Sequence, residues 1–208
     1  SAYDLNLSIY NQLQRTITGW PGGKPGADDK TRPERSNPFP KRSIVFSPHP
    51  DDDVISMGGT FLRLVEQGHE VHVAYQTSGN IAVFDDDAHR FSDFMLGFSK
   101  RFGVAEKEIE GLYHQVTGLL KDTRQKGGEH EMVLAIKGLI RQGEAISACR
   151  FCGVEESNIH FLNLPFYETG SVKKNPVSQA DIDIIKQLLQ EVRPHQIYAA
   201  GDLHDPHG

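Results

Sequence analysis

Short apolar runs alternate with longer amphipathic stretches along most of this sequence. The apolar runs predict four buried strands, at residues 43–47, 71–76, 159–162 and 196–200. Helical spacing predicts one helix at 55–67, ending before Gly68, and another at 178–192 with Ser178 as its N-cap. Strands that alternate with helices form βαβ units. The expected fold is therefore α/β and Rossmann-like, with a mainly parallel sheet flanked by helices.

The long segment between the second and third predicted strands, residues 81–152, contains a helical insertion. Two stripes of large apolar residues recur there at helical spacing, namely Phe91, Phe94, Met95, Phe98 and Phe102, then Ile109, Leu112, Val116 and Leu120. We predict two extra helices that cap one end of the sheet. An aromatic stripe of this kind is more often part of a core than a ligand site, and we interpret it as core.

Residues 1–41 form a separate N-terminal region. Apolar residues at every fourth position predict a helix at 3–18, and the following stretch is rich in Pro, Gly and charged residues, as in an extended linker. The compact domain is therefore expected at 42–208. The linker either wraps this domain as an arm or joins it to an upstream domain, and both alternatives remain open.

Charge and composition exclude some classes of partner. The 208 residues include 22 basic and 28 acidic side chains, a net charge of −6, which argues against nucleic acid or an anionic membrane as partner. No apolar run approaches the roughly 20 residues that a membrane span requires. The chain start is polar and lacks the basic region of a signal peptide, so we expect a cytoplasmic protein.

The two cysteines, Cys149 and Cys152, form a single C-x-x-C near the end of a predicted helix, just before Gly153. A redox pair would sit at a helix N-terminus, and a structural zinc site would need a second pair. We therefore interpret both as half-buried structural cysteines. Of the remaining histidines, we expect His69 and His72 on the surface and His160 in the core with a hydrogen bond.

The first predicted strand runs directly into a turn with one histidine and three carboxylates, Pro48-His49-Pro50-Asp51-Asp52-Asp53. Such a cluster at the end of a buried strand is costly unless its charge is compensated, and a metal ion does so. His49 and Asp52 are three residues apart in the turn, so their side chains can converge on one point. The acidic residues also stand at the N-terminus of the next helix, which favours negative charge.

The last predicted strand leads into a second polar loop, residues 201–207, which contains His204 and His207. Parallel strands present their carboxyl ends at one edge, where open α/β sheets bind ligands. We therefore predict a divalent-metal site formed by His49, Asp52 and His207. Zinc is the expected ion, and another divalent metal such as iron could replace it. Two histidines and one carboxylate leave positions open, which is typical of a catalytic site.

A carboxylate that lies close to such a site without being a ligand can act as the general base. Asp51 is the candidate, and the metal would activate a water molecule as the nucleophile. His204 could polarise the substrate carbonyl or protonate the leaving amine.

These residues resemble those of the PIG-L/LmbE-like zinc-dependent N-deacetylases. The resemblance covers about residues 43–208. The matching positions are 47–52, 58–60, 77–80, Arg141, Glu144, Ala148, 153–154, 161–165, His204 and His207. It implies hydrolytic removal of an N-acetyl group from an N-acetylglucosamine-type amino sugar. It places the metal ligands at His49, Asp52 and His207, the base at Asp51 and the carbonyl-stabilising or acid role at His204.

The resemblance also gives Arg141 a substrate-contacting role, for which the alternative is a surface salt bridge with Glu144. The sequence departs from the family at Asp53, where Glu is usual, and at Asp205-Pro206 before His207. Family members continue beyond this point, so we expect the domain to be truncated at its C-terminus.

The linker and the His-Pro-Asp-Asp turn together resemble the C-terminal module of two-domain chains with a glucosamine-6-phosphate deaminase-like first half. That resemblance implies an upstream deaminase-like domain. The departures from the family pattern keep a second hypothesis open, in which the chain is a catalytically inactive sugar-binding or regulatory module attached to such a domain.

Overall fold

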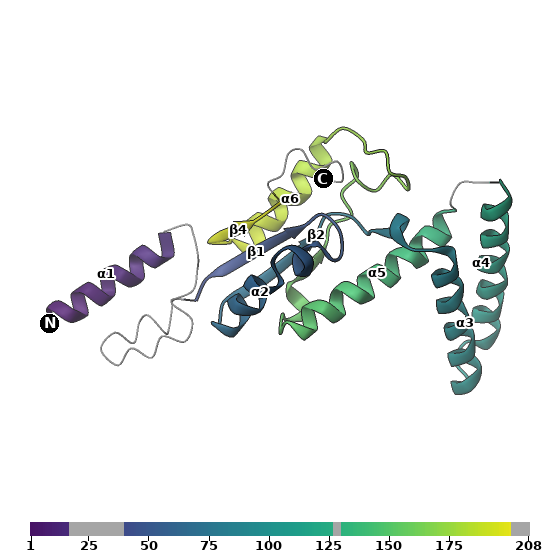
Figure 1. The fold of residues 1–208 in the computed structure, drawn as a ribbon, viewed down its shortest axis with the longest axis horizontal. Helices are drawn as coiled ribbons and strands as arrows, with labels where there is room; N and C mark the ends of the chain where they lie inside the picture. Colours follow the sequence, from purple (N-terminus) through teal and green to yellow (C-terminus); the bar gives the residue numbers. More distant parts are fainter. Residues whose placement is uncertain (17–39, 127–129, 201–208) are drawn as a thin grey trace.

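The sheet has four parallel strands in the order β3-β2-β1-β4 among the residues that the computed structural model describes, 1–16, 40–126 and 130–200 (Figure 1). The strands are β1 Arg42–Ser47, β2 Glu70–Tyr75, β3 Ile159–Phe161 and β4 Gln196–Tyr198. The helices are α1 Ala2–Thr16, α2 Asp52–Glu66, α3 Asp85–Phe102, α4 Glu106–Lys126, α5 Glu131–Phe151 and α6 Gln179–Val192, with short 3-10 turns η2 Asn80–Ala82 and η3 Glu156–Asn158. The predicted α/β, Rossmann-like fold with a parallel sheet and a helical insertion is confirmed.

Strand β1 lies at the point where the strand order reverses. It pairs in parallel with β2 on one side and with β4 on the other, where Ser43 is opposite Gln196 and Val45 is opposite Tyr198. The loops that follow β1 and β4 therefore leave the same edge of the sheet from adjacent strands. This reversal point is where open α/β sheets bind ligands.

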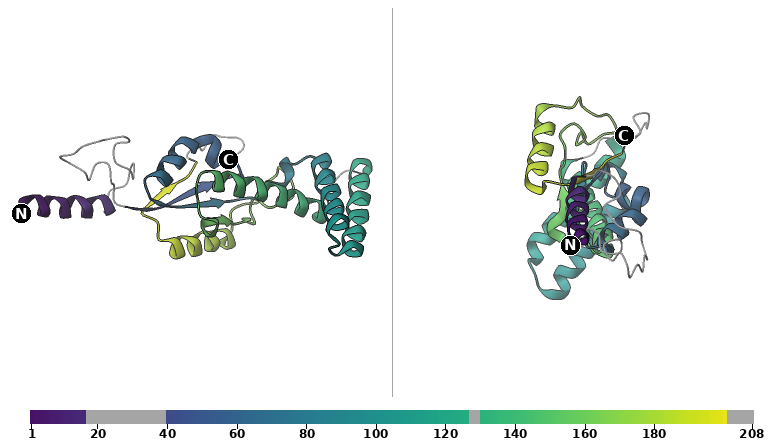
Figure 2. Two further views of the ribbon diagram at one scale, coloured as in Figure 1. Left: turned by 90° about the horizontal axis from the view of Figure 1, so that it is seen from below. Right: turned by 90° about the vertical axis from the view of Figure 1, so that its left-hand side faces the viewer.

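The two faces of the sheet are covered by different helices (Figure 2). Helices α2 and α5 cover one face, in a core cluster of Phe61, Leu64, Val71, Val73, Tyr75, Ala145, Cys149, Cys152 and Val154. Helix α6 covers the other face, in a cluster of Ile44, Phe46, Ala74, Leu188 and Val192. Because side chains alternate along a strand, β2 contributes to both clusters. Because both faces of the sheet are buried, the sequences of its strands are nearly continuous apolar runs.

Helix α2 begins earlier than the prediction of 55–67, directly at the acidic turn. Asp52 and Asp53 lie in its first turn, where the helix dipole favours their charge. Met57 has non-helical backbone angles, φ −145° and ψ 26°, so a kink separates this first turn from the rest. The predicted end is confirmed, because Gly68 follows with φ +75°.

Helices α3 and α4 form a hairpin beyond the carboxyl ends of the strands, and its main contacts outside itself are with α5 (Figures 1 and 2). A small core of Ala88, Val116, Leu120 and Val133 joins the three helices. The prediction that the aromatic stripe is core is wrong, since Phe94 and Phe102 are 68% and 64% exposed. Helix α3 instead buries small residues, Ala88, Ser92 and Ser99. Helical spacing identifies a stripe, whereas the neighbouring helices decide which side of α3 is covered.

The predicted N-cap of α6 is confirmed. The Ser178 amide and hydroxyl both donate to Asp181 Oδ2, at 2.8 and 2.5 Å. Asp181 Oδ1 accepts from the amide of Phe166, so this cap also ties the segment after β3 to the helix.

Replacing Ser178 with alanine is expected to lower the free energy of unfolding by about 1 kcal/mol, because an N-terminal cap is lost. Urea unfolding measures the change. Ser157→Ala, at an exposed position in η3, serves as the control. Equal stability of the two variants would show that the cap contributes nothing.

Helix α1 agrees with the predicted helix at 3–18 and lies apart from the sheet in both figures. The predicted linker falls mostly at 17–39, outside the described residues, so the domain division near residue 41 stays a prediction. Among the helices that the structure describes, none has the length and apolar character needed to cross a bilayer.

Candidate active site

The turn after β1 is fixed by hydrogen bonds of its own. The Ser47 hydroxyl donates to the His49 carbonyl at 2.5 Å and accepts from the Asp53 amide at 3.0 Å. The Asp51 amide also donates to the His49 carbonyl, at 2.8 Å. These bonds hold the backbone so that His49, Asp51 and Asp52 extend beyond the carboxyl end of β1.

His49 and Asp52 converge, as their spacing predicted. Asp52 Oδ2 lies 2.9 Å from the backbone nitrogen of His49 and 2.9 Å from its ring Nδ1. Both side chains are about one third exposed, at 33% and 35%. An imidazole nitrogen and a carboxylate oxygen, both open to solvent, are suitable ligands for zinc or another divalent transition metal.

The other ring nitrogen of His49 contacts a residue that the sequence did not single out. The Tyr167 hydroxyl lies 2.9 Å from His49 Nε2, and the two rings meet edge to face with centroids 5.4 Å apart. Tyr167 belongs to the segment after β3, more than a hundred positions along the chain. No spacing rule could have joined these two residues.

Arg141 of α5 reaches the turn. Its Nη2 lies 2.8 Å from Asp51 Oδ2, and its Nη1 lies 2.6 Å from Glu144 Oε2. The Arg141 side chain is only 17% exposed, so the salt bridge with Glu144 is not the simple surface pair that one alternative expected. Burial opposes the charge on Arg141, but its bonds to Asp51 and Glu144 outweigh burial and raise its pKa. Arg141 therefore remains a cation that holds the Asp51 carboxylate.

The loop after β2 closes against this turn. Gly79 has φ +67°, and a Cβ there would lie 2.8 Å from Pro50 Cδ and 3.3 Å from Arg141 Nε. Only glycine allows this close approach. Next to it, Glu168 accepts hydrogen bonds from the Thr77 hydroxyl at 2.6 Å, the Ser78 hydroxyl at 2.9 Å and the Ser78 amide. Glu168, like Tyr167, lacked any signal in the sequence.

Asp53 points away from the other two carboxylates, into the core. It is 2% exposed, and its Oδ2 accepts from the Tyr75 hydroxyl at 2.9 Å. Burial raises the pKa of Asp53, and the Tyr75 hydrogen bond partly offsets this. Asp53, which stands where the family usually has Glu, thus anchors the turn to the core through Tyr75.

Cys149 and Cys152 were expected to be half-buried structural cysteines, and both are instead fully buried. They are free thiols at the C-terminal end of α5. Burial raises the pKa of Cys149 to about 11, which keeps it protonated and unreactive.

The prediction of a surface position is wrong for both His69 and His72, which are 6% and 7% exposed. His69 Nδ1 accepts from the Lys41 amide at 3.0 Å. His69 immediately precedes β2, whereas His72 lies within β2 on the face covered by α6, beside Glu191 and Val192. Their position at the start of a predicted strand suggested exposure, whereas packing around the sheet buries them.

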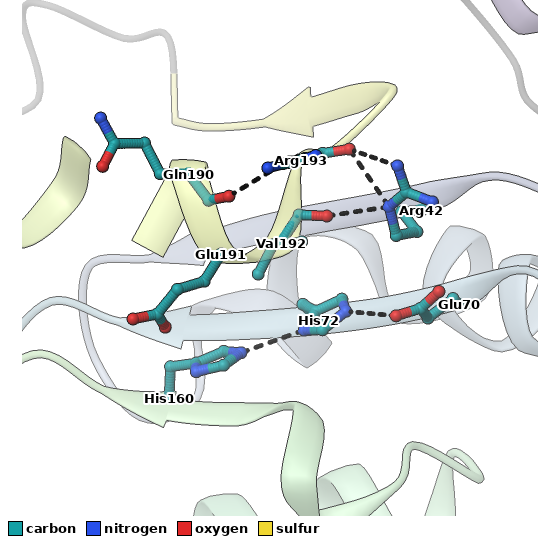
Figure 3. Close-up of a pocket in the computed structure, with 8 residues that line it drawn as sticks. All are labelled: Arg42, Glu70, His72, His160, Gln190, Glu191, Val192 and Arg193. Atoms are coloured by element: carbon teal, nitrogen blue, oxygen red, sulfur yellow. Dashed lines mark hydrogen bonds and ion pairs between the residues drawn. The ribbon is translucent and has the colours of Figure 1, made fainter. Parts of the chain in front are cut away.

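His72 and His160 lie side by side on neighbouring strands and line an open pocket of about 740 Å³ together with Glu70 and Glu191 (Figure 3). His72 Nδ1 is 3.0 Å from His160 Nε2, and His72 Nε2 is 3.0 Å from Glu70 Oε1. The predicted hydrogen bond of His160 is confirmed, but this residue is only partly buried and not in the core as predicted. The residues of this pocket come from the beginnings of β1 and β2, from β3 and from the C-terminal end of α6, and none of them belongs to the His49 turn.

The second half of the predicted site falls on residues that the structure does not describe. His204 and His207 lie within 201–208, just after the described end of the chain at residue 200. Across residues 1–16, 40–126 and 130–200, no group of three or more His, Cys, Asp or Glu side chains is arranged to hold a metal ion. The described residues thus include two of the three predicted ligands, His49 and Asp52.

A parallel sheet with a histidine and carboxylate turn at its reversal point defines the chain as an α/β protein of the class that binds ligands at the carboxyl edge of the sheet. The comparison with known families goes further. Residues 44–208 match the PIG-L family, described as GlcNAc-PI de-N-acetylase, and the chain belongs to this family of de-N-acetylase hydrolases.

A glucosamine-6-phosphate deaminase-like protein of Bacteroides thetaiotaomicron is 56% identical over 209 residues, which cover 100% of this chain and 32% of that protein. The chain thus spans about a third of the length of the relative it matches. No solved structure was found to match it.

Proposed function

We propose that the chain is a metal-dependent N-deacetylase that hydrolyses the acetamido group of an N-acetylglucosamine-type sugar. The observation that carries the proposal is the 2.9 Å convergence of His49 Nδ1 and Asp52 Oδ2 at the reversal point of a PIG-L family sheet. Asp51 lies beside this pair and contacts Arg141 instead. The turn therefore separates a pair of potential ligands from a potential base.

His49 and Asp52 would hold the metal together with His207, and their donor atoms fit zinc or iron. When bound, such an ion acidifies a water molecule and polarises the acyl oxygen of the amide. In the proposed reaction Asp51 removes a proton from the attacking water. The water oxygen bonds to the acyl carbon, the C–N bond breaks, and His204 protonates the leaving nitrogen. The products are acetate and a free amino sugar.

Arg141 orients Asp51 in this scheme. Its 2.8 Å bond to Asp51 Oδ2 fixes one carboxylate oxygen, which leaves the other to accept a proton. The substrate-binding role of Arg141 is part of this proposal.

One observation favours the second candidate function, a catalytically inactive sugar-binding or regulatory module. The Asp51 carboxylate, the proposed base, is already held by the Arg141 guanidinium, with 2.8 Å between Arg141 Nη2 and Asp51 Oδ2. The relative that matches the whole chain is about three times longer, so a module of this kind could serve an attached deaminase-like domain.

Removal of divalent metal is expected to abolish acetate release from N-acetylglucosamine or its 6-phosphate, and zinc or iron is expected to restore it. The assay uses the full chain, dialysed against a chelator and then reloaded, with free amine and acetate measured. Undiminished activity after verified metal removal would refute metal dependence. Stoichiometric zinc without acetate release from either sugar would favour the inactive module.

A further inference from the structure

Tyr167 is the described residue whose side chain contacts the ring of His49 on the side away from Asp52. Its hydroxyl lies 2.9 Å from His49 Nε2, while Asp52 Oδ2 lies 2.9 Å from Nδ1. We propose that Tyr167 is a positioning residue, which fixes the orientation of the His49 ring and selects Nδ1 as the nitrogen that faces the metal. This inference rests on the proposed metal site.

The chemistry of a hydroxyl suits this role. Without a metal, a proton on His49 Nδ1 can bond to Asp52, and the bare Nε2 then accepts from the Tyr167 hydroxyl. With an ion at Nδ1, the neutral ring would carry its proton on Nε2, and this N–H would donate a hydrogen bond to the Tyr167 hydroxyl oxygen. A hydroxyl can donate and accept, so Tyr167 serves His49 in both states. Outer hydrogen bonds of this kind orient metal-binding histidines.

Tyr167 is held on both sides along the chain. Before it, the Phe166 amide donates to Asp181 Oδ1 at 2.9 Å. After it, Glu168 accepts hydrogen bonds from Thr77 and Ser78 on the loop beyond β2. These anchors come from α6 and from the sheet edge, so the position of the Tyr167 hydroxyl is set by the fold.

The ring of Tyr167 is fixed as well. It meets the His49 ring at 89°, edge to face, and the Lys174 ammonium lies 4.4 Å from its centroid on one face. These ring contacts would survive loss of the hydroxyl. Tyr167→Phe therefore removes the hydrogen bond to His49 and keeps the packing.

Tyr167→Phe is expected to weaken zinc binding about 10- to 100-fold, the usual effect of removing an outer partner of a metal-binding histidine. Zinc affinity is measured on the full chain by competition with a chromophoric chelator. Tyr113→Phe, on α4 and away from the turn, is the matched control and should bind zinc like the parent chain. The thermal midpoints of the metal-free variants should agree, which separates positioning from loss of structure.

A second measurement needs no metal. The ring ¹⁵N signals of His49 in the metal-free chain should shift in Tyr167→Phe and stay unchanged in Tyr113→Phe. Unchanged zinc affinity together with unchanged His49 signals in Tyr167→Phe would overturn the inference. If the parent chain binds zinc but releases no acetate, the proposed reaction fails while the affinity comparison still decides the role of Tyr167. If it binds no zinc, the inference is overturned along with the metal site.

Discussion

Asp51→Asn is expected to lower the turnover of an N-acetylated amino sugar by about 100- to 10,000-fold, the range for loss of a general base. Its zinc content should remain that of the parent chain. The reason is the position of the two carboxylates. Asp52 contacts the ring Nδ1 of His49, whereas Asp51 contacts Arg141. Asparagine keeps the shape of the side chain but cannot take a proton from water.

The measurement combines steady-state acetate release with metal analysis of the same samples. Asp52→Asn is the informative partner, because it should lose zinc as well as activity. Asp183→Asn, an exposed carboxylate on α6, should change neither. Loss of zinc in Asp51→Asn with retention in Asp52→Asn would show that the two roles are exchanged.

His69 is expected to make the fold sensitive to mild acid. Burial, and secondarily the charge of Lys41, lowers the pKa of His69 from 6.5 to about 4. Its Nδ1 accepts from the Lys41 amide at 3.0 Å, so a proton on Nδ1 would set two donors against each other. The unfolded chain binds this proton near pH 6.5 and the folded chain only near pH 4. Stability is therefore complete above pH 6.5 and is lost as the pH falls from there through 4.

Between pH 7 and about pH 4.5, this linkage should cost the parent chain about 2 to 3 kcal/mol of unfolding free energy. His69→Asn should lack that loss, because the asparagine oxygen can accept from Lys41 and never binds a proton. Urea unfolding at several pH values gives the comparison, with His114→Asn on the exposed side of α4 as the control. Parallel stability curves for the parent chain and His69→Asn would disprove the linkage.

Much of the fold could be predicted because the relevant signals are local. Apolar runs marked all four strands, and Gly68 and Ser178 marked helix ends that the structure confirms. The convergence of His49 and Asp52 was also predictable, since three residues in a tight turn allow few arrangements. The role of these two residues as ligands stays a prediction, as do the roles of His204 and His207.

The errors share one cause. The exposed phenylalanines of α3 and the buried His69 and His72 were all assigned from their sequence neighbours. Burial depends on which elements pack over a residue, and those elements come from distant parts of the chain. Among the described residues, no element packs over the aromatic stripe of α3 in the hairpin, whereas His69 and His72 are buried where β2 lies between its neighbouring strands.

The sequence by itself determined the α/β class, the strand and helix order, and the turn that carries His49, Asp51 and Asp52. These follow from periodicity, caps and short-range spacing, which act within a few residues. Only the tertiary structure decided that β4 pairs with β1 and that Arg141 binds Asp51. It also decided that Tyr167 contacts His49 and that Glu168 binds Thr77 in the loop after β2. Those contacts join residues far apart along the chain, and they form only when the parallel sheet brings its carboxyl-end loops together.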